Sequence, residues 1–563
     1  MKSRTYPQRS SIITGLALAL ALATYAPSAH ANVYASNIKI NGVLTGSATV
    51  AEGSGATITY ILNEPASLGV AVQILSGATP ACTIIINSGP GTTRGLNRVV
   101  WDGTDGNGNT LLPGNYTVQI IAESSGYLSW TQINQATDPG YSVFWPDGIA
   151  VDTSTNSPYY GRIMVANGAP SSAYQPGIYK LNADGSYADE GPAGVSTAGY
   201  AFRTDGGDGD SCRCIAYGTD DRVYFNDWYG NGRVVACDMI MSTNQIIWDS
   251  GSSPAFKGLA YGCGYIDVTD PGTTNGLVWC ADNSDYPGIG IWVFPLTNNG
   301  VADSASAGIQ VVAIGPDIGL RAGNGLAIDE WGDIFVGQTR ANAGDPAERA
   351  INITNVWGAS FGYPTNWWNN AGSYPITSTD LNWAVGSADN TMEDSSSVAI
   401  DSRTNPQYVS VTFNGGAGGM KILYATNGAL VANIEQSAGV YYVGTGWDNV
   451  GNVYAGSAAG YWAEFSPPGA NAATTPAVAT VTVTAPPTPP HITSITSSGG
   501  TVTIRFTGGA SDPSSAFTLL SSAVVGPLAS YTPAAGATIT GSAGSYTATV
   551  AVGGNIQFYR IKR

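Results

Sequence analysis

One short phrase recurs along the middle of the chain, and it constrains the fold more than any other feature. Its clearest copy runs from Gly323 to Gly337, where an apolar strand pattern ends at Asp329 and a second one follows a glycine-containing turn. Asp329 can accept backbone N–H groups of that turn, and Gly332 can adopt the positive φ that such turns require. Five further segments share this theme, so the phrase indicates an architecture rather than a single motif.

The spacing of the six segments predicts a β-propeller. Aligned on Asp329, they place the corresponding residue at positions 152, 218, 262, 329, 401 and 448. The shortest steps between these positions, 44 and 47 residues, equal about one four-stranded blade. The longer steps require insertions or contain one further blade, so we expect six blades and leave seven open. The irregular spacing also leaves a β-helix or an array of sandwiches as the alternative fold.

The phrase G-[LI]-A-[IV]-D before a turn and a strand resembles the repeat of NHL-type and related six-bladed propellers. The resemblance implies a central propeller over about residues 140–468. Small residues suit its first strand, because inner strands crowd around the axis. Propellers bind ligands with loops at one end of the axis, so the insertions between blades are the best candidate sites.

The first 31 residues predict export. Lys2, Arg4 and Arg9 precede an apolar run over residues 12–23, and a small-x-small cleavage site follows at Ala29–Ala31. The apolar run is short for a bilayer span, so we expect cleavage after Ala31, with an uncleaved anchor as the alternative. The expected location is extracellular or at the cell surface of a Gram-negative bacterium, with the periplasm as a further option.

Charge and histidine content exclude several classes of function. Of the 22 Lys and Arg residues, three lie in the signal segment, so the mature chain has 19 against 39 Asp and Glu, a net charge of −20. Such a balance argues against nucleic acid and anionic membrane surfaces as partners. The two histidines, His30 and His491, lie outside the central domain, which therefore lacks a Ser-His-Asp or Cys-His system and a His-ligated zinc. Only 11% of residues are charged and glycines number 73, as is typical of an all-β secreted protein.

Residues 32–123 predict an N-terminal β-sandwich. Runs such as 57–62, 70–74 and 116–120 have strand composition and are separated by turn residues. The segment Gly95–Gly108 contains W-D-G-T-D-G-N-G and is followed by P-G-N-Y, which resembles the FlgD-type Ig-like domain. The resemblance implies a module for assembly or spacing without catalytic residues. Residues 124–139 are expected to connect it to the propeller.

An aromatic-rich insertion is the first candidate binding site of the central domain. Flat rings pack on the C–H faces of sugars and amides bond their hydroxyls, so a polysaccharide is the candidate ligand. The alternative is that these rings bury the insertion against the blades, because Trp is first a large hydrophobe. The aromatic residues concerned are Trp357, Tyr363, Trp367, Trp368, Tyr374 and Trp383.

Two metal hypotheses arise from carboxylates and amides. Asp205, Asp208 and Asp210 lie on a glycine-rich loop that could hold Ca²⁺, with a solvated acidic turn as the alternative. The phrases around Asn324 and over residues 146–150 resemble gluconolactonase-like six-bladed propellers. That resemblance implies a divalent cation held at the axis by Glu, Asn and Asp, with Asn324 as the Asn. Glu190, in Glu190-Gly191-Pro192, has the letters expected for the Glu but lies outside a repeat strand, so the resemblance supplies no Glu ligand within a repeat. Ca²⁺ is the candidate cofactor of the chain.

Cysteine positions suggest one disulfide bond. Export permits disulfides. Cys263 and Cys280 lie on or beside consecutive strands of one repeat, so they are the first choice for a bond. Buried small hydrophobic residues are the alternative role for the cysteines of this domain.

The last part of the chain predicts a spacer and a further β-module. Residues 469–490 are rich in Pro and Thr and predict a semi-rigid linker. Residues 491–563 predict a small C-terminal β-sandwich, which resembles the terminal β-module of secreted proteins from environmental Gram-negative bacteria.

Together these features favour a non-catalytic function. We expect an exported binding or scaffold protein whose partner is a polysaccharide or another surface protein. The alternatives are a metal-dependent propeller hydrolase of the gluconolactonase-like type and a structural subunit of an extracellular assembly. No later run predicts a transmembrane segment after signal cleavage.

Overall fold

The computed structural model describes residues 33–168, 177–192, 194–202, 212–227, 233–249, 265–269, 276–281, 290–296, 309–313, 323–329, 332–338, 349–353, 381–386, 395–401, 403, 406–413, 418–435, 439–476, 478–525, 530–553 and 557–563. Their regular structure is almost entirely strand, with a 3-10 helix at η4 (Ser514–Ala516). No helix in these ranges is long and apolar enough to cross a bilayer. The all-β prediction is therefore confirmed.

Within the described residues, the central region contains six four-stranded antiparallel sheets. The sixth sheet takes its outer strand from a segment that precedes the first sheet in the chain. From inner to outer strand, the sheets are β9 (Ile149–Val151), β10 (Ile163–Asn167), β11 (Gly177–Leu181) and β12 (Val195–Ser196); β13 (Ile215–Tyr217), β14 (Arg222–Asp227), β15 (Arg233–Asp238) and β16 (Asn244–Asp249); β17 (Tyr265–Thr269), β18 (Leu277–Ala281), β19 (Gly290–Pro295) and β20 (Ile309–Ala313); β21 (Gly323–Ile328), β22 (Ile334–Gln338), β23 (Arg349–Ile353) and β24 (Leu381–Gly386); β25 (Ser395–Ile400), β26 (Tyr408–Phe413), β27 (Met420–Tyr424) and β28 (Leu430–Ile434); and β29 (Tyr442–Trp447), β30 (Val453–Ser457), β31 (Tyr461–Ser466) and β8 (Thr131–Gln132).

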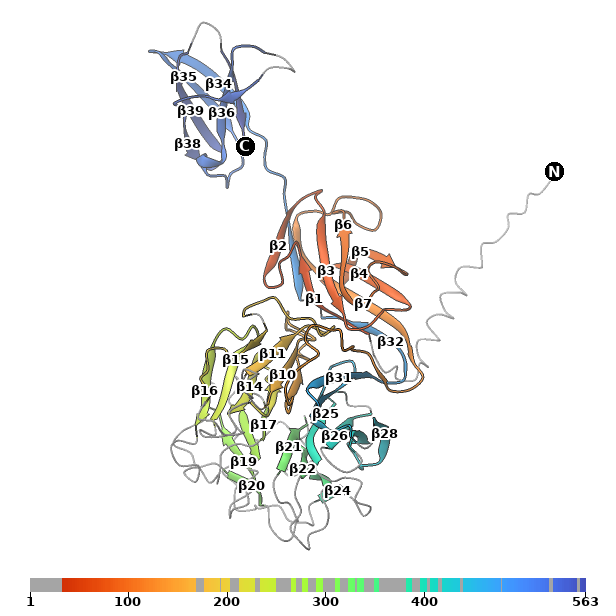
Figure 1. The fold of residues 1–563 in the computed structure, drawn as a ribbon. Coiled ribbons are helices and arrows are strands. Elements are labelled where there is room, and N and C mark those ends of the chain that lie inside the picture. The colour runs from red at the N-terminus through yellow and green to blue at the C-terminus, as the bar shows by residue number, and fades with distance from the viewer. Residues whose placement is uncertain are drawn as a thin grey trace, which may run out of the picture. The chain divides into compact units, whose positions relative to one another are not determined.

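The inner strands form a closed ring. Each contacts the next in the order β9, β13, β17, β21, β25 and β29, and β29 contacts β9 again. Figure 1 labels β17, β21 and β25 of this ring. The pairing of β8 with β31 joins the start of this region to its end. A ring of radial four-stranded sheets with protected edges is a propeller-like arrangement.

The recurrent aspartate closes a tight turn in several of the sheets. Asp329 Oδ1 accepts the N–H of Asp333 at 2.8 Å, and Gly332 has a φ of +83°. Asp448 Oδ1 accepts the N–H groups of residues 450, 451 and 452. The turn function predicted for Asp329 is confirmed, since its carboxylate replaces a backbone acceptor within the turn.

Glycines in the inner strands allow neighbouring sheets to approach closely. A Cβ on Gly325 of β21 would lie 2.5 Å from the backbone N of Val398 on β25. A Cβ on Gly444 of β29 would lie 2.2 Å from the carbonyl oxygen of Pro146. Real Cβ contacts are longer than this, so glycine is required where the inner strands crowd the axis.

Two antiparallel sheets precede the ring in the chain. One contains β1 (Ala35–Ile40), β3 (Ala56–Leu62) and β6 (Gly95–Trp101). The other contains β2 (Ser47–Ala51), β7 (Gly114–Tyr127), β4 (Gly69–Ser76) and β5 (Thr79–Ile86). Alternate residues along these strands, such as Ile58 and Tyr60 on β3, are buried, as in a two-layer packing. The FlgD-type Ig-like assignment of this region stays a prediction.

The expected linker is wrong over residues 469–484. These residues form β32 (Gly469–Thr474), which pairs with β7, and β33 (Ala479–Thr484), which joins the same sheet. The alternation A-T-V-T-V-T buries Ala479 and Val481 and leaves the threonines between them partly exposed. Residues from both ends of the central region thus share one sheet, and the Pro-rich part of the segment begins only at Pro486.

A second compact unit contains residues 483–563. Its first sheet has the order β34 (His491–Ser498), β35 (Thr501–Thr507), β39 (Ser545–Ala551) and β38 (Thr538–Ser542). Its other sheet has the order β37 (Thr532–Pro533), β36 (Thr518–Ser522) and β40 (Phe558–Lys562). Phe506, Phe517 and Tyr546 pack together in the core of this unit.

Candidate functional site

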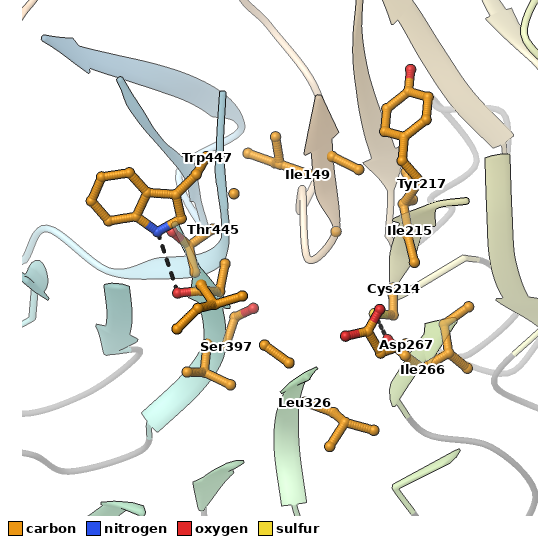
Figure 2. Close-up of a pocket in the computed structure, with 18 of the residues that line it drawn as sticks. Ile149, Cys214, Ile215, Tyr217, Ile266, Asp267, Leu326, Ser397, Thr445 and Trp447 are labelled. Atoms are coloured by element: carbon orange, nitrogen blue, oxygen red, sulfur yellow. Dashed lines mark hydrogen bonds between the residues drawn. The ribbon is translucent and has the colours of Figure 1, made fainter. Parts of the chain in front are cut away.

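A cavity of about 250 Å³ lies at the centre of the ring, where all six inner strands contribute lining residues (Figure 2). Most of the lining is backbone and aliphatic side chain. The polar or reactive side chains among the lining residues are Asp147, Thr153, Cys214, Tyr217, Asp267, Ser397, Thr445 and Trp447. We call this space the axial cavity.

Asp267 joins two neighbouring sheets at the axial cavity. It lies on β17, and its Oδ2 accepts the N–H of Ile328 on β21 at 2.7 Å. Its Oδ1 accepts the N–H of Val268, also at 2.7 Å. Burial raises the pKa of Asp267 to about 7, and the two backbone hydrogen bonds oppose that rise. The carboxyl is therefore partly ionised at neutral pH.

Asp147 provides the second carboxylate of the axial cavity. It precedes β9, is 4% exposed, and its Oδ2 has no hydrogen-bond partner among the described residues. Arg213 Nε lies 3.6 Å from that oxygen, which is an ion pair but not a hydrogen bond. Burial raises the pKa of Asp147 to about 7, and the charge of Arg213 opposes the rise. Asp147 thus adds a buried carboxylate oxygen without a hydrogen bond to the lining of the cavity.

Hydroxyl groups line the cavity across from Asp267 (Figure 2). Thr445 Oγ1 shares a 2.8 Å hydrogen bond with Ser410 Oγ, and Trp447 Nε1 donates to the same Ser410 oxygen at 2.9 Å. Trp447 Nε1 also lies 3.3 Å from the carbonyl oxygen of Ala399 (Figure 2). The indole is therefore held by the sheets of β25 and β29, and it offers no free N–H to a ligand.

The cavity supports binding better than nucleophilic chemistry. Cys214 is its one thiol among the described residues, and burial raises the pKa of Cys214 to about 12. A thiol with such a pKa stays protonated at pH 7 and is a poor nucleophile. The remaining polar groups include carboxylates, which accept hydrogen bonds, and hydroxyls, which both donate and accept them.

Trp383 is a core residue, which corrects its assignment to a ligand-binding face. It is 8% exposed, donates its indole N–H to the carbonyl oxygen of Ala425 at 2.7 Å, and lies 6.1 Å from the ring of Phe335. The packing alternative therefore applies to this residue. The other members of the aromatic set lie outside the described residues: Trp357, Tyr363, Trp367, Trp368 and Tyr374.

The metal candidates are placed only in part. Asp205, Asp208 and Asp210 lie outside the described residues. Asn324 belongs to β21, whose Leu326 lines the axial cavity, but the Asn324 side chain is outside the described part. Within the described ranges no three His, Cys, Asp or Glu residues cluster closely enough to hold a metal ion.

Glu190, the carboxylate with the letters expected for the gluconolactonase-like site, lies elsewhere. It forms ion pairs with Arg162 and, at 2.9 Å, with Lys39 of β1. It is not among the residues that line the axial cavity. Lys39 and Arg162 stabilise the Glu190 carboxylate at the contact between the first sheets and the ring, which explains why Glu190 lies there.

One of the described cysteines takes part in a disulfide bond. Cys280 is disulfide-bonded, whereas Cys82, Cys212, Cys214 and Cys237 are free thiols. Cys263, the sixth cysteine of the chain, lies outside the described residues. The Cys263–Cys280 bond therefore stays a prediction.

The sequence interpretation missed both cavity carboxylates as site residues. It placed the inner strand of the third repeat at residues 258–262, which lie outside the described ranges, whereas the inner strand is β17. A polar residue inside the apolar run Tyr265–Thr269 was the signal that could have identified Asp267.

Comparison with known proteins finds only distant structural similarity. No protein-family model and no curated sequence matches the chain. A Bacteroides thetaiotaomicron VPI-5482 protein of unknown function is 12% identical, with a TM-score of 0.35, and covers 78% of this chain and 99% of its own. A glucose dehydrogenase is 11% identical, with a TM-score of 0.36, and the match covers 60% of this chain and 99% of the dehydrogenase chain. The Dos1 propeller is 9% identical, with a TM-score of 0.34, and the match covers 61% of this chain and 95% of the Dos1 chain. At this level the likenesses carry no argument for function, and the ring rests on the strand pairing of this chain.

Proposed function

We propose that this chain is an exported binding protein in which a six-bladed propeller holds a small, hydroxyl-rich ligand in the axial cavity. The ligand that we favour is a terminal unit of a polysaccharide. Six sheets and a closed ring of inner strands support six blades. The basic, apolar and small-residue pattern of residues 1–31 supports export.

The spare acceptor of Asp147 is the observation that carries this proposal. A buried acceptor that lacks a hydrogen bond costs about 1–3 kcal/mol, so a donor that reaches it gains affinity. Asp267 adds a second carboxylate to the same cavity, and Ser397 and Thr445 add hydroxyl groups. Sugar hydroxyls both donate and accept, and this lining offers partners for both.

The size of the cavity limits the ligand. Its volume of about 250 Å³ is below the range of about 300–1,000 Å³ typical of sites for drug-sized ligands. A single sugar ring is therefore a better fit than a folded oligosaccharide. The rest of a longer glycan would lie outside the cavity.

Titration calorimetry of the full mature chain against a panel of mono- and oligosaccharides tests the proposal. We expect saturable binding by wild type, and an affinity at least about tenfold lower for Asp147→Asn, the loss of roughly 1.4 kcal/mol. Asp221→Asn is the matched control, because Asp221 is exposed in the same ring and has a positive φ that Asn tolerates. No binding by wild type, or equal binding by Asp147→Asn, would overturn the proposal.

Two further measurements address the alternative functions. Elemental analysis that finds a stoichiometric divalent cation, lost in Asn324→Ala, would replace the binding proposal with the metal-dependent hydrolase. Reversible filaments or large oligomers in sedimentation would favour the structural subunit of an extracellular assembly. Both measurements use the same purified chain as the calorimetry.

A further inference from the structure

The C-terminal unit has the opposite charge from the rest of the chain. From residue 491 onwards the sequence contains one acidic residue, Asp512, and four basic ones, Arg505, Arg560, Lys562 and Arg563. Of the 22 basic residues, three lie in the signal segment and four lie here, which leaves 15 against 38 acidic residues in residues 32–490. Such charge asymmetry along a chain indicates that the two parts meet different partners.

The single acidic residue of this region does not reduce the attraction for anions. Asp512 forms a two-point ion pair with Arg563, with distances of 2.8 Å to Nε and 2.6 Å to Nη2. Arg560 and Lys562 are exposed and make no ion pair within the described part of the chain. Two cations thus remain available to a partner.

These cations line one groove. It has a volume of about 480 Å³ and lies between the extended Pro487–Pro490 segment and the sheet that contains β40. Leu520 of β36 and residues 560–563 form the other side of the groove. In the register of the two strands, Leu520 lies opposite Arg560 and Thr518 lies opposite Lys562.

Strand geometry sets the spacing of the two charges. Ile561 is buried in the core of the unit, so Arg560 and Lys562 on either side of it share the outer face of β40. Two residues along a strand are about 7 Å apart, too far for one small anion to contact both closely. A polymer with repeated negative groups can satisfy both cations and follow the strand.

We infer that this groove binds an anionic polysaccharide, a glycan chain with repeated carboxylate, sulfate or phosphate groups. Arg560 and Lys562 pair with successive anionic groups, and the sugar rings lie along Leu520 and the Pro-rich wall. A nucleic acid fits less well, because the groove has no aromatic side chain on which bases could stack. This site is separate from the axial cavity and does not depend on the ligand proposed there.

The test measures binding of the full mature chain to heparin and to alginate, a sulfated and a carboxylated polysaccharide, with neutral dextran as the control ligand. We expect wild type to bind the two anionic polymers and not dextran, with an affinity that falls as salt rises. The double variant Arg560→Gln/Lys562→Gln should bind at least tenfold more weakly. Arg505→Gln is the matched control, since Arg505 is an exposed cation of the same unit outside the groove, and it should change binding less than twofold.

Several results would overturn the inference. These are no binding of either anionic polymer by wild type, equal losses in Arg505→Gln and in the double variant, or equal binding of dextran. Binding to phosphatidylglycerol vesicles without binding to either glycan would assign the groove to a membrane surface. Self-association that the double variant abolishes, again without glycan binding, would assign it to a second copy of the chain. Lys562→Gln alone, with an expected loss of at least threefold, replaces the double variant if that protein does not fold.

Discussion

The side-chain amide of Asn63 donates to Glu464 Oε1 at 3.3 Å and thereby joins residues 401 positions apart in the sequence. Asn63 follows β3 of the first sheets, and Glu464 lies on β31 of the last sheet in the ring. Tyr454 also donates to Glu464 Oε1, at 3.2 Å. The contact between the first sheets and the ring is therefore built around a fully buried carboxyl group.

Further polar groups strengthen this contact. Arg94 makes two hydrogen bonds to the carboxylate of Asp138, at 2.9 and 2.7 Å, and a third to the carbonyl oxygen of Asp184 at 2.6 Å. Tyr34 packs edge-on against Tyr160 with ring centroids 5.8 Å apart. Two-point Arg–carboxylate pairs fix orientation as well as adding energy, so we expect the first sheets and the ring to unfold together.

The first prediction concerns Glu64, whose buried carboxyl group makes stability depend on pH. Glu64 is 1% exposed, and neither carboxylate oxygen has a hydrogen-bond partner within the described residues. Burial raises the pKa of Glu64 to about 7, so the folded state holds its proton more tightly than the unfolded state. Its contribution to stability is therefore present below about pH 4.3 and is lost as pH rises through about 7.

Glu64→Gln should remove this dependence. At about pH 8 the variant should be more stable than wild type by up to about 3 kcal/mol, and the two should be similar near pH 4. Urea unfolding at a series of pH values gives the difference. Glu123→Gln, at an exposed position on β7, is the control and should follow wild type throughout. A difference between Glu64→Gln and wild type that is constant with pH would contradict the explanation.

The second prediction tests the crowding of the inner strands. Gly325→Ala places a Cβ 2.5 Å from the backbone N of Val398, and backbone cannot move aside as a flexible side chain can. We expect a loss of about 1–3 kcal/mol in the free energy of unfolding. Gly106→Ala is the control, because a Cβ there has nothing within 4 Å and its φ is not positive. Chemical denaturation of both variants provides the comparison.

The third prediction distinguishes the packing of Trp383 from a role in glycan binding. Trp383→Ala removes a buried indole and leaves the carbonyl oxygen of Ala425 without its 2.7 Å donor. A loss of about 3–5 kcal/mol is expected for truncation of such a side chain. Glycan affinity per folded molecule should remain that of wild type. Lower affinity without lower stability would instead place Trp383 on a ligand-binding face.

Much of the fold could be predicted from the sequence because the repeated phrase encodes local geometry. Asp329 and Gly332 close a turn by interactions within a few residues, so the residue types at these positions are enough to predict the turn. The sheet that residues 469–484 join could not be predicted in this way. The alternation over residues 479–484 fits a strand, but β32 pairs with β7 across more than 340 positions, and no local pattern identifies such a partner.

The candidate site was harder to predict for a related reason. Asp267 and Asp147 meet the same cavity only because the ring closes, and the two residues belong to different repeats. Asp147 belongs to the phrase over residues 146–150 that resembles gluconolactonase-like propellers, but only Asn324 was predicted to be a ligand. The aromatic-rich insertion attracted attention because its composition is unusual, yet Trp383 serves the core. The composition of a segment identifies residues that could bind a ligand, but only the structure shows which of them are buried in the core.

The fourth prediction concerns the thiols. Cys82, Cys212, Cys214 and Cys237 are free and Cys280 is disulfide-bonded, so unfolded protein without reductant should react with a thiol reagent at four positions. After reduction all six cysteines of the chain should react. If Cys263 is the partner, Cys263→Ser should expose Cys280 and show five thiols without reductant. Three thiols in that variant would show that Cys280 is bonded to another cysteine of the chain.

The fifth prediction links the two cavity carboxylates to the pH dependence of ligand binding. Burial raises the pKa values of Asp147 and Asp267 to about 7, so both groups gain charge as pH rises through neutrality. Ionised carboxylates accept hydrogen bonds from sugar hydroxyls more strongly than neutral ones do. Calorimetric affinity should therefore rise from about pH 5.5 to about pH 8 and then level off, by roughly tenfold. Asp267→Asn should reduce this rise and Asp221→Asn should retain it, whereas affinity that falls as pH rises would remove the carboxylates from the binding interaction.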